Sequence, residues 1–327
     1  MGNGSSLLFV GMYVNSLTNY DLKKEQVVRP LNLSEQTMNL VFGYMTPKAR
    51  AFLARSRAGP LDMRRILSAL LLISSMWSLQ AHSATCETDD FTQFISGESQ
   101  CLVMRRFGPE DPETIIVWLH GDVSSGGPAN YHYSQASMAA SEFKADRVLS
   151  IALVRPGYPD GNGQTSTVNF FHGGRVDHYT KENLTQVATA IERLRAHFKP
   201  RRVIAVGHSG GAASIAVLLG LRPSLIDGAV LVACPCDLVA WRQGRRSWNR
   251  SEDPSVWLDK VSNSAKVIAL TGESDDNTQP ELARAYTEKL SARGVSASFK
   301  SIPDATHNSS FRSPEVFQAV KSLLESR

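Results

Sequence analysis

Short apolar runs alternate with helix-like stretches through most of the chain after about residue 90. The runs at 113–122 (ETIIVWLHGD) and 201–209 (RRVIAVGHS) are largely apolar, as expected for strands covered on both faces. Residues 176–198 instead space their apolar side chains along one helix face. Repeated units of this kind predict an α/β fold, with helices on both faces of a mostly parallel central sheet. The expected strands are 91–97, 101–107, 113–122, 147–158, 201–209, 226–234, 265–272 and 295–303, and the expected helices are 132–145, 176–198, 210–221, 280–293 and 314–325.

In such a sheet, ligands bind beyond the carboxyl ends of the strands. The motif G-x-S-x-G occurs at one of these ends, as GHSGG from Gly207 to Gly211. It follows an apolar strand and begins a helix, which is the context of a nucleophile elbow. Ser209 is therefore the candidate nucleophile. The alternative is a glycine-rich turn that binds phosphate, although the dinucleotide pattern G-x-G-x-x-G is missing from it.

A nucleophilic serine needs a base and an acid. His307 is the only histidine downstream of Ser209, and it follows the last expected strand. The chain order Ser…Asp/Glu…His places the acid in the segment TGESDDNTQP. We favour Asp275, which follows its strand after a short turn, and keep Asp276 and Glu273 as alternatives. This acid would hold the imidazole tautomer and stabilise the imidazolium ion.

Backbone N–H groups complete a site of this kind. The helix that begins after Ser209 offers the N–H of Gly210 as one oxyanion donor. The loop after the strand 113–122 offers a second donor, from Asp122 or Val123. We interpret His120, at the end of the same strand, as a structural residue.

A small cap over the domain is expected at residues 235–264. This segment contains Trp241 and Trp248 among several arginines. We expect these two tryptophans, with Tyr158, to contact substrate. The alternative is that the tryptophans pack against the domain and that the arginines are solvated.

A secretion signal is expected at 63–84. Two arginines after Met63 precede a short apolar run and a series of small residues, which is the order of a signal peptide. We therefore expect a secreted or periplasmic protein with no stable membrane partner, a mature catalytic domain at 85–327, and an upstream extension at 1–62 that is either untranslated or disordered. An uncleaved anchor is the alternative.

All four cysteines follow the expected cleavage site. An even number in an exported chain predicts disulfides, and we pair Cys86 with Cys101 first. Cys234 and Cys236 would close a small ring, pair elsewhere, or remain two small apolar residues at a strand end. Neither a metal site nor a cofactor is expected.

Charge argues against a nucleic-acid partner. The formal net charge is +4, but the excess of basic residues lies in the first 65 residues. Nucleic-acid binding requires a basic face on the folded domain. The expected partner is a small molecule.

The segments HGD, RPGY, GHSGG, TGESDDNTQP and DATH together resemble an α/β-hydrolase from about residue 90 to the C-terminus. Among serine hydrolases, they are similar to the prolyl-oligopeptidase and dienelactone-hydrolase-like branch. The resemblance implies a triad of Ser209, Asp275 and His307. The large N-terminal propeller of the oligopeptidases has no counterpart here, and HGD replaces the HGG of many esterases. We expect hydrolysis of a carboxylic ester, with a short peptide substrate or a non-catalytic binding role as the alternatives.

Overall fold

The computed structural model describes residue 86 and residues 89–124, 126–167 and 179–326. The expected extension at 1–62 and the expected signal peptide at 63–84 lie outside these residues. Within the described part, no helix is both long and apolar enough to span a membrane.

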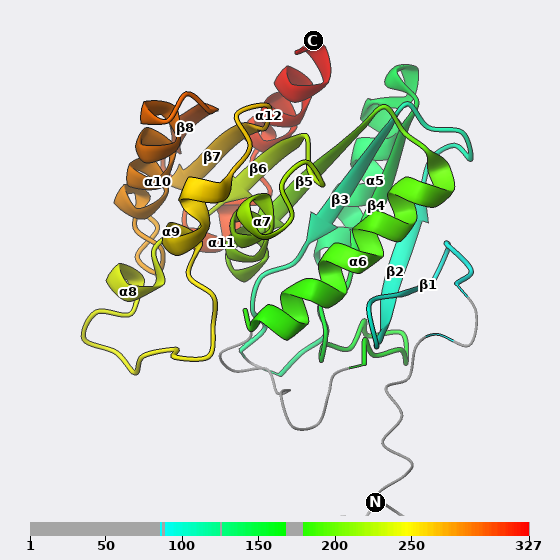
Figure 1. The fold of residues 1–327 in the computed structure, drawn as a ribbon, viewed down its shortest axis with the longest axis horizontal. Helices are drawn as coiled ribbons and strands as arrows, with labels where there is room; N and C mark the ends of the chain where they lie inside the picture. The colour runs from blue at the N-terminus through cyan, green and yellow to red at the C-terminus, as the bar shows by residue number, and fades with distance from the viewer. Residues whose placement is uncertain (1–85, 87–88, 125, 168–178, 327) are drawn as a thin grey trace, which may run out of the picture. The chain divides into compact units, whose positions relative to one another are not determined.

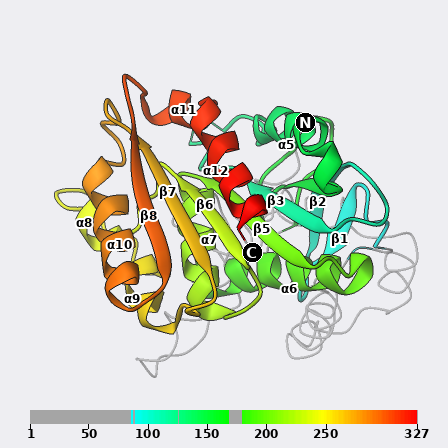
Figure 2. The same cartoon turned by 90° about the horizontal axis from the view of Figure 1, so that it is seen from above.

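The described strands form one sheet in the order β1-β2-β4-β3-β5-β6-β7-β8 (Figures 1 and 2). Strands β3 to β8 run parallel to one another, whereas β2 runs antiparallel to both β1 and β4. The predicted mostly parallel sheet is thus confirmed. The strands are β1 (Phe94–Ser96), β2 (Cys101–Phe107), β3 (Thr114–Leu119), β4 (Val148–Leu153), β5 (Arg202–His208), β6 (Gly228–Val232), β7 (Lys266–Gly272) and β8 (Ser296–Ile302).

Helices cover both faces of the sheet. In Figure 2, α6, α7 and α10 lie on one face, and α5 and α12 lie on the other. The long helices are α5 (His132–Glu142), α6 (Lys181–Phe198), α7 (Gly210–Leu221), α10 (Pro280–Ala292) and α12 (Pro314–Glu325). The short ones are α8 (Leu238–Trp241), α9 (Pro254–Trp257) and α11 (His307–Ser310), with 3₁₀ turns η2 (Lys144–Asp146) and η3 (Leu258–Lys260).

Strand β3 shows why its sequence is apolar at every position. Ile115 and Val117 belong to the core under α6 and α7. Ile116 and Trp118 belong to the core under α5 and α12. Because successive side chains of a strand point to opposite faces, a strand buried on both faces cannot alternate with polar residues.

Several element boundaries differ from the sequence prediction, and three of the differences have a clear local cause. The expected helix 132–145 ends at Glu142, after which the chain forms a 3₁₀ turn and Arg147 takes a positive φ of 50°. The helix α6 begins at Lys181, because the side chain of Thr180 accepts the N–H of Asn183 and caps it. The first strand is shorter than expected because Asp90 Oδ1 accepts the N–H groups of the next residues and forms a turn.

Candidate active site

Ser209 stands on a tight turn between β5 and α7. Its φ of 51° and ψ of −117° are rarely adopted by a residue with a side chain, and cost about 1–3 kcal/mol. The flanking glycines allow the turn. A Cβ on Gly207 would lie 2.5 Å from the nitrogen of Ala212, and one on Gly211 would lie 2.3 Å from the oxygen of Leu119. This crowding explains why the nucleophile-elbow motif requires small residues two positions before and two positions after the serine.

His307 and Asp275 meet at the ends of β8 and β7. The Nδ1 atom of His307 lies 2.9 Å from Oδ2 and 3.1 Å from Oδ1 of Asp275. The amide of Asn277 lies 3.3 Å from Nε2 of His307. An amide N–H can only donate to Nε2, so Nδ1 carries the proton and donates it to the carboxylate. This is the tautomer that a general base next to a serine requires.

The carboxylate of Asp275 is held by Thr278 as well. The N–H and the hydroxyl of Thr278 both donate to it, each at 2.8 Å. Burial alone would raise the pKa of Asp275, but the hydrogen bonds from His307 and Thr278 outweigh it and lower the pKa. The two alternative acids, Asp276 and Glu273, are exposed and do not bond to His307 within the described chain. The structure thus pairs His307 with the acid that the sequence favoured.

The histidine–carboxylate pair lies beside the nucleophile turn. The ring of His307 is 5.0 Å from the ring of His208, which directly precedes Ser209. Among the described residues, no hydrogen bond joins the Ser209 hydroxyl to His307. Such contacts are often long without substrate and tighten in the reacting complex.

The loop after β3 also lies beside Ser209. A Cβ on Gly121 would be 3.0 Å from the Cβ of Ser209. The N–H of Gly121 already donates to the hydroxyl of Tyr131, which leaves the predicted donors Asp122 and Val123 in this loop. The other predicted oxyanion donor is the backbone N–H of Gly210. Gly210 is the first residue of α7, where backbone N–H groups lack acceptors within the helix.

Sequence reasoning missed a buried ion pair behind this loop. Arg155 donates to Oδ1 of Asp122, Tyr179 donates to Oδ2 at 2.7 Å, and Tyr158 donates to Oδ1 at 3.3 Å. A Cβ on Gly210 would lie 2.5 Å from the same Oδ1. The carboxylate of Asp122 therefore covers the start of α7, in addition to the backbone role predicted for this residue.

Charge is fixed in this cluster. Burial would lower the pKa of Arg155, but the charge of Asp122 outweighs it and raises the pKa. Burial raises the pKa of Tyr158 to about 12 and that of Tyr179 well above its usual value. The position of Arg155, two residues after the end of β4, was the one sequence signal for it, because ligands bind at strand ends.

His120 and Tyr158 are both buried. His120 accepts the N–H of Arg155 at 2.9 Å and contacts the carbonyl of Gly121 at 2.7 Å, in keeping with the structural role predicted for it. Tyr158 is 1% exposed and its hydroxyl serves the ion pair. The structure thus places Tyr158 behind the site, whereas the sequence predicted a substrate contact.

The two predicted cap tryptophans contact each other and link Asn277 to Tyr179, and we call this pair the aromatic bridge. Trp241 donates its Nε1–H to the carbonyl of Asn277 at 2.8 Å, and its ring lies 5.2 Å from Trp248. Trp248 in turn lies 5.4 Å from Tyr179. The bridge therefore runs from the segment that holds His307 to the cluster that holds Asp122. The guanidinium of Arg242 lies over both indole rings.

Both cysteine pairs are oxidised. The structure joins Cys86 to Cys101, as predicted. It also joins Cys234 to Cys236, which decides among the three states left open for that pair. The second disulfide follows β6 at the base of the cap.

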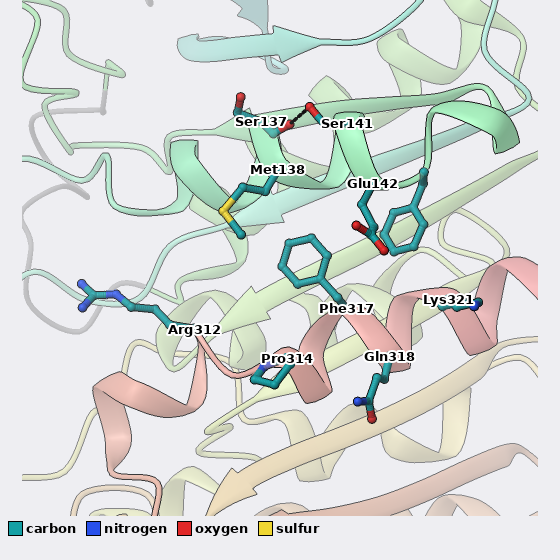
Figure 3. Close-up of a pocket in the computed structure, with 10 residues that line it drawn as sticks. Ser137, Met138, Ser141, Glu142, Arg312, Pro314, Phe317, Gln318 and Lys321 are labelled. Atoms are coloured by element: carbon teal, nitrogen blue, oxygen red, sulfur yellow. Dashed lines mark hydrogen bonds between the residues drawn. The ribbon is translucent and has the colours of Figure 1, made fainter.

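A separate cavity of about 820 Å³ lies between α5 and α12. Figure 3 shows Met138 of α5 pointing toward Phe317 of α12, with Arg312 and Lys321 on the α12 side. None of the predicted site residues lines it. No group of three or more potential metal ligands occurs in the described segments.

Comparisons with known proteins agree with this geometry. The Alpha/beta hydrolase family matches residues 116–268. No curated protein sequence matches the chain significantly.

Solved structures share the fold at low identity. Est1E from Butyrivibrio proteoclasticus is 12% identical, with a TM-score of 0.51 over 72% of this chain and 97% of that one. The esterase Pf2001 of Pyrococcus furiosus is 11% identical, with a TM-score of 0.53 over 74% and 94% of the two chains. The acylaminoacyl peptidase of Pyrococcus horikoshii is 14% identical, with a TM-score of 0.51 over 70% of this chain but only 40% of that one. The sheet order, the turn at Ser209 and the family match over residues 116–268 together show that this chain has the α/β-hydrolase fold.

Proposed function

We propose that the protein is a serine hydrolase that cleaves carboxylic esters of small molecules. The observation that carries this proposal is the pairing of His307 Nδ1 with Asp275 at 2.9 Å, beside a serine with a φ of 51° at a helix start. A strained serine persists only where the surrounding structure enforces it, and such positions concentrate at active sites.

The proposed reaction gives each of these groups one role. Nε2 of His307 takes the proton of the Ser209 hydroxyl as its oxygen attacks the ester carbonyl. The N–H of Gly210 and one N–H from Asp122 or Val123 stabilise the resulting oxyanion. The intermediate collapses to an acyl-enzyme, and the alcohol leaves with the proton from His307. Water, deprotonated by His307, then attacks the acyl-enzyme, and the acid leaves as His307 returns the proton to the Ser209 oxygen.

We favour an ester over a peptide as the substrate because the match covers different shares of the esterase and the peptidase. The match covers 94% of the Pyrococcus furiosus esterase but 40% of the acylaminoacyl peptidase. The esterase thus needs little beyond the part shared with this chain, whereas most of the peptidase lies outside it. Cleavage of short peptides is the alternative, since the same histidine can protonate an amine leaving group.

Export from the cytoplasm is part of the proposal. The two disulfides support it, because disulfides form and persist in oxidising compartments. N-terminal sequencing of the protein recovered outside the cytoplasm should begin near residue 85. A mature chain that retains residues 1–62 would contradict both the signal peptide and the expected domain boundary.

Labelling by a fluorophosphonate tests the catalytic proposal. The wild type should be labelled, and Ser209→Ala should not. Short-chain and long-chain esters should then be compared with peptidyl amides. A wild type that is not labelled would support a non-catalytic binding protein, and faster turnover of amides than of esters would favour the peptidase.

A further inference from the structure

A buried chain of hydrogen bonds connects three loops around Ser209. The N–H of Gly121 donates to the hydroxyl of Tyr131. The same hydroxyl lies 2.8 Å from Nδ1 of His208, and Nε2 of His208 lies 2.9 Å from the carbonyl oxygen of His307. Tyr131 and His208 were not among the residues that the sequence pointed to.

The direction of every bond in this chain is determined. A carbonyl oxygen only accepts, so Nε2 of His208 must carry a proton. Burial, followed by the charge of His307, lowers the pKa of His208 to about 4, so the ring is neutral and Nδ1 is an acceptor. The hydroxyl of Tyr131 therefore donates to Nδ1. Burial also raises the pKa of Tyr131, which keeps this hydroxyl protonated.

Each end of the chain fixes one part of the site. Gly121 precedes Asp122 and Val123, which offer the second oxyanion donor, and it packs against Ser209. His208 precedes Ser209. The carbonyl of His307 belongs to the residue whose ring must receive the serine proton. Three segments that are distant in sequence are thus fixed relative to one another through two side chains.

We propose that Tyr131 and His208 are positioning residues that align the oxyanion loop, the nucleophile turn and the general base. The role rests on the proposed function, because alignment matters only if Ser209, His307 and the loop act together. Misplacement of reacting groups by about 1 Å can cost about 100-fold in rate. The two side chains are aligned by packing as well, since Phe311 stacks on His208 and meets the ring of Tyr131 edge-on.

Tyr131→Phe is the direct test, with Tyr133→Phe as its matched control. Both changes remove one hydroxyl near the start of α5. The hydroxyl of Tyr133 is buried and has no hydrogen-bond partner among the described residues, whereas that of Tyr131 joins Gly121 to His208. For Tyr131→Phe we expect kcat on an ester to fall about 10- to 100-fold, with KM changed less than about twofold. For Tyr133→Phe we expect no change in kcat.

His208→Phe and His208→Gln extend the test. Phenylalanine keeps the stack on Phe311 but loses both hydrogen bonds, and glutamine retains an amide that can donate to the carbonyl of His307. We expect His208→Gln to recover part of the kcat that His208→Phe loses. Thermal melting of each variant separates this effect from unfolding. If the role were purely structural, the melting temperature would fall, but kcat measured well below that temperature would not change.

The outcomes separate the proposal from the function on which it rests. If the wild type is labelled by fluorophosphonate but Tyr131→Phe keeps full kcat, the positioning role is wrong and the hydrolase stands. If the wild type is not labelled, the hydrolase is wrong. In either case, ¹⁵N NMR of the wild-type imidazoles should show His208 neutral and protonated on Nε2 at pH 6, despite His307, Asp275 and Asp122 nearby. Protonation on Nδ1 would overturn the proposed chain.

Discussion

The two sides of Ser209 are built from different chemistry. On the histidine side, His307 bonds to Asp275 and Thr278, and its side chain is 16% exposed. On the ion-pair side, Asp122 bonds to Arg155, Tyr158 and Tyr179. The Arg155 side chain is only 5% exposed.

The difference corresponds to what each side has to do in the proposed reaction. The histidine side must take up a proton and return it, so its central group is an imidazole next to a carboxylate. The ion-pair side must keep the loop and the start of α7 in place while charge develops beside them. It therefore uses groups that hold their protonation state, since the pKa values of Arg155, Tyr158 and Tyr179 are all raised.

On the histidine side, Asp275→Asn should cause the largest loss of activity among the changes to the two sides of Ser209. Oδ1 of Asp275 accepts the backbone N–H groups of Asn277 and Thr278. The NH2 group of an asparagine would therefore face Nδ1 of His307 and disfavour the Nδ1-protonated tautomer. The corresponding change in another serine hydrolase lowers kcat about 10⁴-fold. We expect a loss of that order in ester turnover, with the fold unchanged by circular dichroism. The matched control is Asp276→Asn, because Asp276 is exposed one residue away. Equal losses in both variants would mean that Asp275 is not the acid.

Arg155→Met should act on the ion-pair side through stability and rate together. Removing one partner of a buried pair leaves an uncompensated charge and costs about 3–5 kcal/mol. The carboxylate of Asp122 would then carry an uncompensated charge beside the start of α7, where the oxyanion donor Gly210 lies, so we also expect kcat to fall about 100-fold. Denaturant unfolding and ester kinetics measure the two effects.

Arg147→Met provides the control for that experiment. Arg147 pairs with Asp111 at the surface, with their side chains 48% and 82% exposed. Exposed pairs contribute about 0–1 kcal/mol. A loss at Arg155 no larger than the loss at Arg147 would show that the buried pair does not hold the site.

The fold and the histidine side were predictable because local patterns determine them. Continuous apolar runs predict strands covered on both faces, and a serine between Gly207 and Gly211 at a strand end predicts the turn. His307 followed from chain order, since no other histidine lies downstream. The acid followed less directly, because three candidates share one turn and only the bond to His307 separates Asp275 from its neighbours.

The ion-pair side was not predictable because its members meet only in three dimensions. Arg155 follows β4, Asp122 follows β3, and Tyr179 precedes α6, so no spacing in the sequence relates them. Tyr131 and His208 are similar, since their link depends on how α5 packs over the turn. Side chains that meet only across the folded sheet produce no periodic pattern in the sequence.

Acid should weaken the molecule through two buried histidines, His208 and His132. Burial lowers the pKa of His208 to about 4 and that of His132 to about 3, against 6.5 in the unfolded chain. Between these values the unfolded state binds more protons, so stability is present above about pH 6.5 and is lost as the pH falls. We expect the free energy of unfolding to fall by about 2 kcal/mol or more from pH 7 to pH 5.

Urea unfolding at pH 7, 6 and 5 measures this loss, and His208→Phe should reduce it. Arg155, Tyr158 and Tyr179 do not titrate in this window, because their raised pKa values lie far above it. A stability that stays constant from pH 7 to pH 5 would contradict a neutral, buried His208.

Tyr158→Phe should have the smallest effect, and it distinguishes the two descriptions of this residue. If Tyr158 contacts substrate, as its sequence position suggested, the change raises KM. The structure instead places its hydroxyl against Arg155 and Asp122, where Tyr179 also donates to the carboxylate. We therefore expect a stability loss of about 1 kcal/mol with an unchanged KM, measured by urea unfolding and by kinetics on one ester. A raised KM with unchanged stability would move Tyr158 from the ion-pair side to the wall of the substrate pocket.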